Sequence, residues 1–442
     1  MTVPYHKSAS LYQTNAQDFN NHPLRASQDA MSTPHNDIIK DPDIAIIGGG
    51  FTGISAALNL AERGYDVGVF EAGNIGEGGS GRNGGHLCQG WSTDFDVIAR
   101  QLDPAYRQMA WDAGCEAVET VAGRIKKHKI ACDLTWGYVH AALHKKQLQG
   151  ALHMQAEYEA QDYPHMTALP DRDSLRAHIN SPAYIGGVFD ARSGHLNPLL
   201  LLHGLAKAAL EAGANIYQHT AVRSTANQDG QHILELSGGR QIKARILLYC
   251  GNAYLGPLAP HSLRLRLAQV SSSILATTPL SDAQKHALMP SHAAIADGNT
   301  ALNYFRLDAQ NRLIFGGRAS YLNREPSDLE GDLRRRMIAV FPDLVHQPAE
   351  QVWSGRIGIT VNRSPHFGRL ANGAYFAQGY SGHGVALSNF TGKLMAEAIA
   401  GETERFEIFS RLKHLPFPGG ILRKPALALG MSWHKLRDWL QI

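Results

Sequence analysis

The sequence predicts an α/β fold in which a Rossmann-type, dinucleotide-binding domain is assembled from separated segments and a second domain is built on an antiparallel sheet. Three observations predict it. A G-x-G-x-x-G motif at residues 48–53 connects a β-branched run to an apolar helix. Two later apolar runs, ending near residues 250 and 378, are again followed by glycine. The stretch from about 262 to 363 instead consists of short alternating segments, which are typical of antiparallel strands.

The N-terminal elements form a strand–helix–strand unit. Residues 43–47 are a β-branched run ending in glycine, as in a buried parallel strand. Residues 52–63 carry Ala, Leu and Ile at helical spacing, and Gly64 follows where a helix commonly ends. Residues 65–70 are the next expected strand, which ends at Glu71. The unit has the size of a βαβ crossover.

Farther along the chain, residues 100–180 are expected to be mainly helical, with 106–129 and 145–162 the clearest pieces, and 198–212 form another helix. Strands are expected at 215–226 and 232–236, with Asp229-Gly230 as the turn between them, and at 245–250. The antiparallel segments are 268–277, 301–307, 313–317 and 352–361. A last strand at 374–378 precedes a helix at 385–400.

This order of elements gives an expected domain plan. Residues 1–40 are an N-terminal extension. The dinucleotide-binding domain is discontinuous and takes residues 41–100, 181–260 and 364–442. A helical region, 101–180, and a β-rich region, 261–363, form the substrate domain.

The composition fits a globular enzyme and argues against several other classes. Of 442 residues, 44% are hydrophobic and 18% charged, and the formal net charge of +3 comes without an extended basic tract, which disfavours nucleic-acid binding. Four cysteines lie far apart with no CxxC pair, so no metal site or disulfide framework is expected. Residues 1–40 are polar and lack the apolar core of a signal peptide, and no transmembrane segment is expected, so we expect a cytoplasmic protein.

Each glycine of the 48–53 motif has a mechanical role in dinucleotide binding. Gly48 permits a tight turn, Gly50 admits a pyrophosphate, and Gly53 lets the helix pack closely on the strand. The helix N-terminus faces the phosphates, and Glu71 can accept hydrogen bonds from ribose hydroxyls. The carboxylate disfavours NADP, but the motif does not separate FAD from NAD.

Two further glycine-rich loops favour a flavin. Residues 80–85 (SGRNGG) follow Glu71 closely, so this polar loop can approach the cofactor ring. Residues 379–384 (GYSGHG) precede a helix whose positive N-terminal end suits the negative charge of a reduced flavin at its N1/C2=O edge. Each loop taken alone also fits an ordinary glycine turn.

The three motifs, in this order and spacing, resemble the D-amino-acid-oxidase-like group of FAD-dependent amine oxidoreductases. The likeness covers nearly all of the chain beyond residue 40 and includes 193–198 (SGHLNP), 251–256 (GNAYLG), 311–317 (NRLIFGG) and 416–420 (PFPGG). It implies noncovalent FAD, oxidation of an amine to an imine, release of an aldehyde after hydrolysis, and O2 as the acceptor, giving H2O2. Some relatives attach flavin through a His in the segment that matches 82–85. Here the matching residue is Asn83, and His86 lies three residues beyond it.

The candidate site residues lie on these loops and on neighbouring strands. Those expected to contact the cofactor are Gly48, Gly50, Gly53, Glu71, Ser80, Arg82, Asn83, Gly84, Val222, Gly251, Ser381, Gly382, His383, Gly384 and Val385. Those expected to act in catalysis at the flavin's reactive face are His383, Tyr380, Tyr304, Arg306 and Trp353. Arg306 is the candidate to bind a substrate carboxylate bidentately, with a structural ion pair as the equal alternative. For His383 the alternative is a structural role at a helix cap.

Two other functions stay open on the sequence alone. One is NAD- or FAD-dependent oxidation of a different substrate, such as a hydroxy acid. The other is a dehydrogenase for amines or N-methyl amino acids that lies on a membrane and reduces a quinone, because Trp433, Leu436, Trp439 and Leu440 can share a helix face within 424–442. Packing of that helix on the rest of the protein is the simpler interpretation.

Overall fold

A six-stranded sheet forms the first part of the computed structural model, which describes residues 8–15, 39–299, 301–320 and 327–418. The strand order is β17-β18-β11-β1-β2-β7, and every neighbouring pair is parallel except β17 with β18. All residues of β1 and β2 are buried, as expected for parallel strands that are covered on both faces. The strands are β1 (Ile44–Ile47), β2 (Val67–Phe70), β7 (Asn215–Tyr217), β11 (Ile246–Tyr249), β17 (His366–Arg369) and β18 (Tyr375–Gln378).

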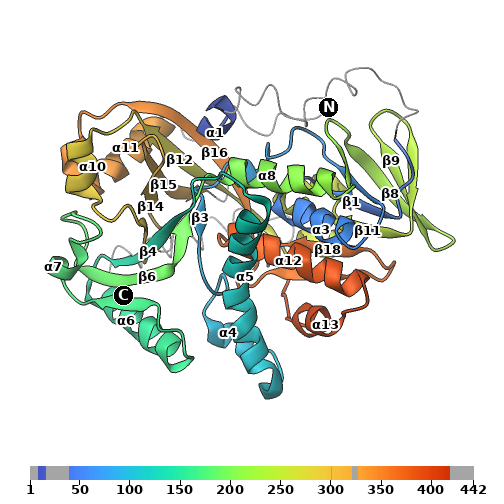
Figure 1. The fold of residues 1–442 in the computed structure, drawn as a ribbon, viewed down its shortest axis with the longest axis horizontal. Coiled ribbons are helices and arrows are strands. Elements are labelled where there is room, and N and C mark those ends of the chain that lie inside the picture. The colour runs from blue at the N-terminus through green and yellow to red at the C-terminus, as the bar shows by residue number, and fades with distance from the viewer. Residues whose placement is uncertain (1–7, 16–38, 300, 321–326, 419–442) are drawn as a thin grey trace.

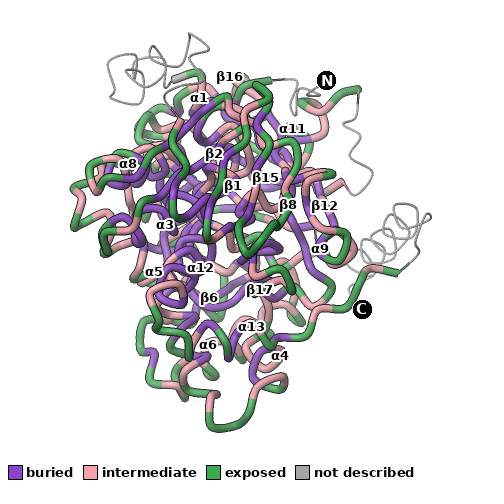
Figure 2. The backbone as a smooth tube through the Cα atoms, turned by 90° about the vertical axis from the view of Figure 1, so that its right-hand side faces the viewer, coloured by how far each residue is buried: buried purple, intermediate pink, exposed green. Residues whose placement is uncertain are grey.

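Helices cover one face of this sheet and a small sheet covers the other. The helices are α3 (Phe51–Ala61), α5 (Arg107–His128), α8 (Pro198–Glu211), α12 (Gly384–Ile399) and α13 (Glu404–Ser410), and they share one hydrophobic core with β1 and β2. The small sheet is antiparallel and consists of β8 (Val222–Gln228), β9 (Gln231–Leu236) and β10 (Gln241–Ala244). In Figure 2 the buried backbone of β1, β2, α3 and α12 contrasts with the exposed turn beside β8.

An ion cluster ties three of these helices together. Glu116 on α5 accepts hydrogen bonds from Lys393 on α12 and Arg405 on α13, each at 2.5 Å. Burial raises the pKa of Glu116, but the two cations outweigh that effect and hold its pKa below the usual 4.5.

A nine-stranded sheet forms the second part, with the order β16-β12-β15-β14-β13-β4-β6-β3 and β5 paired to β6. Of its pairs, only β13 with β4 is parallel within the described residues. The strands are β3 (His86–Leu87), β4 (Thr135–Ala142), β5 (Met166–Leu169), β6 (Gly186–His195), β12 (Ala268–Thr277), β13 (Ala294–Asp297), β14 (Tyr304–Leu307), β15 (Leu313–Ser320) and β16 (Ala349–Ile359).

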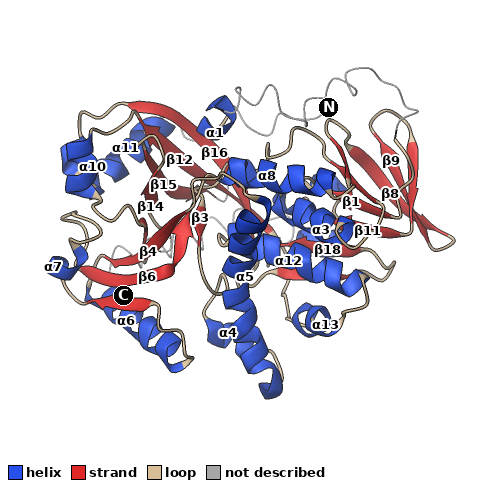
Figure 3. Cartoon of the chain, in the orientation of Figure 1, coloured by secondary structure: helices blue, strands red, loops and turns tan. Residues whose placement is uncertain are grey.

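Helices α6 (Lys145–Ala160), α7 (Arg172–Leu175), α10 (Asp282–Leu288) and α11 (Leu329–Val340) accompany this sheet, and α7, α10 and α11 contribute to its core. Figures 1 and 3 show the two parts side by side, with α5 between them. The shorter elements are α1 (Leu11–Asn15), α4 (Phe95–Ala99), α9 (His261–Leu265) and the 3-10 turns η2 (Gly79–Gly81), η3 (Pro104–Tyr106), η4 (Asn252–Tyr254), η5 (Gly256–Leu258) and η6 (Pro342–Leu344).

The predicted fold class is confirmed, since a doubly covered parallel sheet is joined to a mainly antiparallel one. Two predicted elements are wrong. Region 100–180 is not mainly helical throughout, because β4 and β5 join the larger sheet there. The expected strand 215–226 is two strands, β7 and β8, because the chain turns at His219 (φ 53°) and passes from the parallel sheet into the small one.

Two segments also lie outside the part of the molecule where the domain plan put them. Strand β6 belongs to the larger sheet, where it pairs with β4, although 181–260 was expected in the dinucleotide-binding domain. Helix α5 packs with α8 and α12 on the parallel sheet, although 101–180 was expected in the substrate domain. The remaining domain limits stay predictions.

No helix among the described residues is long and apolar enough to cross a membrane. The segment 424–442, on which the membrane-surface alternative depends, lies outside the described residues.

Candidate active site

A cavity of about 1440 Å³ lies where the carboxyl ends of the parallel strands meet the larger sheet. Its walls include Gly48 after β1, Glu71 after β2, Gly251 after β11 and Tyr380 after β18. Open α/β sheets bind their ligands at this edge. The volume exceeds the roughly 300–1,000 Å³ of a pocket for a drug-sized ligand, so the cavity has room for a ligand of dinucleotide size.

The glycine motif has the geometry that its sequence predicted. Gly48 has φ +108°, and a Cβ there would lie 3.0 Å from the backbone of Gly251. A Cβ on Gly53 would lie 2.0 Å from the carbonyl oxygen of Gly48, so only glycine lets α3 pack this closely on the turn. Gly48 and Gly50 line the cavity, and α3 begins at Phe51. The N–H groups of Gly49 and Phe51 bond to Glu71 and Ser80, so phosphate would use the remaining N–H groups at the start of α3.

Glu71 lies at the end of β2 and lines the same wall. Its carboxylate accepts hydrogen bonds from the backbone N–H groups of Gly49 (2.7 Å) and Gly73 (3.0 Å). Burial raises the pKa of this carboxyl. Glu71 therefore shapes the glycine turn itself, and its predicted bond to a ribose stays a prediction. Val222 lines the cavity at this end as well.

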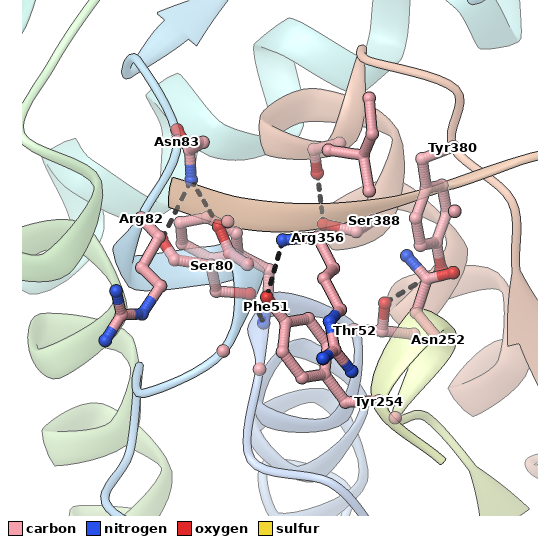
Figure 4. A pocket seen from close by; sticks show the side chains of 18 of the residues that line it. Phe51, Thr52, Ser80, Arg82, Asn83, Asn252, Tyr254, Arg356, Tyr380 and Ser388 are labelled. Carbon is pink, nitrogen blue, oxygen red and sulfur yellow. Dashed lines mark hydrogen bonds between the residues drawn. The ribbon is translucent and has the colours of Figure 1, made fainter. Parts of the chain in front are cut away.

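The loop 78–85 crosses the cavity wall and is fixed by its own polar groups (Figure 4). Ser80 Oγ accepts a hydrogen bond from the N–H of Phe51 at 3.0 Å. The Asn83 amide donates to the carbonyls of Gly79 and Ser80, and its oxygen accepts from the N–H of Gly85. Gly84 lines the cavity, where a Cβ would come within 2.6 Å of the Tyr304 ring.

Arg82 lines the cavity, but its guanidinium serves the protein itself. Its Nε donates to the carbonyl of Glu77 (2.8 Å), and its Nη1 donates to the carbonyls of Ser8 (2.8 Å) and Ser354 (3.2 Å). The side chain thus holds the loop in place and leaves its backbone to face the cavity.

The loop 379–384 closes the opposite wall ahead of α12. Ser381 and Gly382 both have positive φ, 49° and 109°, which turns the chain so that α12 begins at the cavity. His383 is the N-cap residue, and Gly384, Val385 and Ser388 line the cavity after it. Tyr380 lies deeper, and its hydroxyl shares a 2.8 Å hydrogen bond with Thr52 Oγ1 at the start of α3.

Aromatic side chains of the larger sheet line the end of the cavity beyond Gly84. Tyr304 hydrogen-bonds through its hydroxyl to Ser272 Oγ at 3.1 Å. The His86 ring meets Tyr138 and Tyr304 edge-on, with centroid distances of 5.5 and 5.4 Å. His86 Nε2 is buried and has no hydrogen-bond partner among the described residues.

Two of the cavity histidines, His86 and His383, have lowered pKa values that keep them neutral at pH 7. Burial, followed by the charges of Arg306, His195 and His383, lowers the pKa of His86 well below 6.5. Burial and the nearby His140 and Arg363 lower the pKa of His383 to about 4.

Arg306 does not bind a cavity ligand, which corrects the sequence-based expectation. It is 2% exposed and absent from the cavity wall, because the Gly84–Gly85 backbone lies between it and the cavity. Its guanidinium donates to the carbonyls of Gly84 (2.6 Å) and Leu307 (3.3 Å) and to the Tyr12 hydroxyl (3.1 Å).

Trp353 is also misassigned as a catalytic residue. It is fully buried in a cluster with Leu11 and Leu199, outside the cavity wall. Its Nε1 donates to the carbonyl of Arg82 at 3.0 Å, so it supports the loop from behind.

Several wall residues were not singled out from the sequence. Asn252 has φ 45°, and its oxygen accepts from the N–H of Gly379 at 3.0 Å, which joins two strand ends. Tyr254 accepts a hydrogen bond from the N–H of Arg356 at 2.8 Å, and the Arg356 side chain extends beside it in Figure 4. Arg363 lines the cavity from the turn after β16. Asn252 could have been found, because it lies three residues after the end of β11 in the parallel sheet, whereas neither arginine has a sequence signal.

Comparison with known proteins decides the family. Residues 43–398 match the family described as "FAD dependent oxidoreductase". The chain belongs to this family. FAD also fits the cavity, because the glycine turn, the starts of α3 and α12 and the Gly84 wall leave the close backbone approach that a flavin dinucleotide needs.

The relatives and solved structures agree with this assignment. The chain is 36% identical to gamma-glutamylputrescine oxidoreductase of Escherichia coli K12 over 90% of its own length and 93% of that protein. It is 24% identical to the glycine oxidase of Geobacillus kaustophilus over 84% of its length and 97% of that protein. The fold is similar to the structure of L-proline dehydrogenase from P. horikoshii, with a TM-score of 0.68, 18% identity and coverage of 83% and 95% of the two chains. The predicted FAD-dependent oxidoreductase is therefore confirmed.

Proposed function

We propose that this FAD-dependent oxidoreductase oxidises the C–N bond of a small amine that carries a carboxylate, with gamma-glutamylputrescine as the best candidate. The imine product hydrolyses to an aldehyde, and O2 accepts the electrons to give H2O2. The E. coli relative is named for this substrate, and two of the more distant relatives are named oxidases.

The charge of the cavity carries the proposal. Among the described wall residues the carboxylates are Glu71 and Glu77, both beside the dinucleotide turn. The opposite end is formed by tyrosines, neutral histidines, Ser272 and Arg363. The second ammonium group of a free diamine would find no carboxylate there. The α-ammonium of gamma-glutamylputrescine has a carboxylate on the same carbon, and that carboxylate can pair with Arg363.

Arg363 takes the role that the sequence gave to Arg306. It lies in the turn between β16 and β17, and its charge contributes to the lowered pKa of His383, so the two side chains are near each other. Ser92 Oγ donates to the Arg363 carbonyl at 2.5 Å and fixes this turn. Arg363 is exposed, so solvent screens any pair that it forms.

The amine must lose its proton before oxidation. An alkylammonium with a pKa of about 10.4 costs on the order of 4 kcal/mol to deprotonate at pH 7.4. An enclosing wall of Tyr138, Tyr304 and neutral histidines favours the uncharged amine by desolvation. His86 lines this wall, and its lowered pKa keeps it from placing a second positive charge beside the amine.

FAD held by the glycine turn and the start of α12 would supply the acceptor for the hydride equivalent that leaves the substrate carbon. The chain supplies the surroundings for this transfer. The start of α12 places backbone N–H groups at one wall of the cavity, where they can stabilise negative charge. Gly84 and Tyr304 form the opposite wall and exclude water from the reacting carbon.

A turnover panel tests the substrate and the acceptor together. Gamma-glutamylputrescine, putrescine, an N-methyl amino acid and a hydroxy acid are compared, with H2O2 release and dye reduction measured in parallel. We expect the glutamylated amine to react best and to release H2O2. Equal rates for putrescine would contradict the role of the carboxylate, and dye reduction without H2O2 would show a dehydrogenase.

Acid precipitation tests the noncovalent linkage. The Asn83 side chain is occupied by hydrogen bonds within its loop and offers no nucleophile, so the yellow colour should stay in the supernatant. Colour in the pellet would contradict noncovalent binding and point to His86.

A further inference from the structure

Residues 8–15 lie outside the part of the chain that matches the family, residues 43–398, yet they are built into the structure. Figure 1 shows α1 beside β16 and β12, at the edge of the larger sheet. Ser10, Leu11 and Tyr12 are 0%, 1% and 4% exposed. Leu11 and Tyr12 share a core with Leu199 and Trp353. This degree of burial is unusual for a segment near a chain end and calls for a role.

The segment bonds directly to the loop that forms the cofactor wall. Ser10 Oγ donates to the carbonyl of Gly81 at 2.9 Å. Gln13 Nε2 donates to the carbonyl of Gly76 at 3.4 Å. In the other direction, Arg82 Nη1 donates to the carbonyl of Ser8 at 2.8 Å. The loop therefore meets residues 8–13 on the side away from the cavity.

Tyr12 reaches the same loop through two of the residues that the sequence wrongly placed in the cavity. Its hydroxyl accepts from Arg306 Nη2 at 3.1 Å, and Arg306 Nε donates to the carbonyl of Gly84 at 2.6 Å. Its ring packs edge-on against Trp353, with centroids 5.5 Å apart, and Trp353 donates to the carbonyl of Arg82. The carbonyls of three residues between 81 and 84 are thus held from behind, either by the segment or by a residue that touches it.

We propose that residues 8–13 are a positioning element for the cofactor: they hold loop 76–85 in the shape that binds FAD. The inference rests on FAD binding in this cavity, and none of these residues touches the cofactor itself. A buried carbonyl needs a hydrogen-bond partner, so loss of these donors releases the loop into other conformations. The apparent affinity for FAD then falls in proportion to the fraction of molecules whose loop keeps the FAD-binding conformation.

The test uses substitutions that each remove a single oxygen, so that folding is least disturbed. Ser10→Ala removes the bond to Gly81, and Tyr12→Phe removes the bond to Arg306 while keeping the ring. The control is Thr14→Ala, which removes one oxygen together with a methyl group. Thr14 lies just beyond the proposed element, and its Oγ1 bonds to the Ser10 carbonyl and to Gln351 but not to the loop. FAD is titrated into the flavin-free full-length proteins and followed by flavin fluorescence.

Each single variant should bind FAD roughly two- to tenfold more weakly, and the double variant more weakly still, since one hydrogen bond contributes about that factor. Thr14→Ala should stay within about twofold of wild type. Hydrogen exchange of the holoenzymes should show faster exchange in 76–85 for Ser10→Ala and Tyr12→Phe only. Wild-type affinity and exchange in the double variant, or equal losses in Thr14→Ala, would overturn the proposal.

Failure of the proposed function would look different. A wild-type protein that binds no FAD would overturn the cofactor assignment. Hydrogen exchange of residues 76–85, measured in the flavin-free protein, would then be the test of whether the N-terminal segment holds the loop. Faster exchange in the double variant would support it, and unchanged exchange would overturn it.

Discussion

Replacing Arg306 by methionine separates the two roles that this residue has been given. Methionine keeps much of the length and apolar character but removes three donors, to Gly84, Leu307 and Tyr12. Arg306 is 2% exposed, so the oxygens that lose their donor cannot form replacement hydrogen bonds with water. Breaking a buried, charged hydrogen-bond network of this kind costs about 2–5 kcal/mol. We expect a lower melting temperature and loss of bound flavin, because Gly84 belongs to the cofactor wall.

The reciprocal variant is Arg363→Met. Arg363 is exposed at the cavity, and the hydrogen bonds that it makes with other described residues use only its backbone. Its loss should therefore leave melting temperature and flavin content unchanged. It should raise KM for gamma-glutamylputrescine about two- to fivefold, the equivalent of about 0.5–1 kcal/mol for a solvent-screened pair, and leave KM for putrescine unaltered. The assays are flavin content, thermal melting and steady-state kinetics with both amines. An Arg306→Met enzyme that keeps its flavin and stability but loses its preference for the glutamylated amine would refute this reasoning.

Three further predictions concern the cofactor turn and acid stability. Gly53→Ala should lower the free energy of unfolding by about 1–3 kcal/mol and weaken FAD binding, because its Cβ would lie 2.0 Å from the Gly48 carbonyl oxygen. The control is Gly123→Ala, where the added Cβ would meet open space. Equal melting temperatures for the two variants would contradict the packing argument. Glu71→Ala should weaken FAD binding by about 1.5–3 kcal/mol through loss of charged hydrogen bonds, measured by fluorescence titration, and full occupancy on dilution would remove Glu71 from this role. The Glu116 cluster has a lowered carboxyl pKa, so its contribution is complete above pH 4.5 and is lost as pH falls through the folded value. Urea unfolding from pH 3 to 6 should show this loss in wild type, and a Glu116→Gln protein with the same acid slope would contradict it.

The dinucleotide turn could be predicted in detail because its roles depend on local backbone geometry. Glycine is needed at positions 48, 50 and 53 because the chain turns tightly from β1 into α3 and the helix packs closely on that turn. The spacing of the three glycines is therefore enough to predict this geometry. The same holds for the start of α12, which was placed within a residue or two from its glycines and apolar spacing.

Arg306 and Trp353 could not be placed in this way. Arg306 shares its strand with Tyr304, and Trp353 shares its strand with Arg356, and both Tyr304 and Arg356 line the cavity. The alternation of a strand predicts which face of the sheet a side chain takes, but it does not predict which other element covers that face. The covering elements are loop 84–85 and residues 8–15, which are distant in sequence. The location of β6 in the larger sheet was missed for a similar reason, since its partners β3 and β4 are set by long-range pairing.

The direct test of the account is anaerobic mixing of the purified flavoprotein with gamma-glutamylputrescine or with putrescine at equal concentration, while the flavin absorbance is followed. The account predicts complete bleaching by the glutamylated amine, at a rate about two- to fivefold above that with putrescine, since one solvent-screened carboxylate–Arg363 pair contributes about 0.5–1 kcal/mol. Bleaching by neither amine, or at the same rate by both, would contradict it.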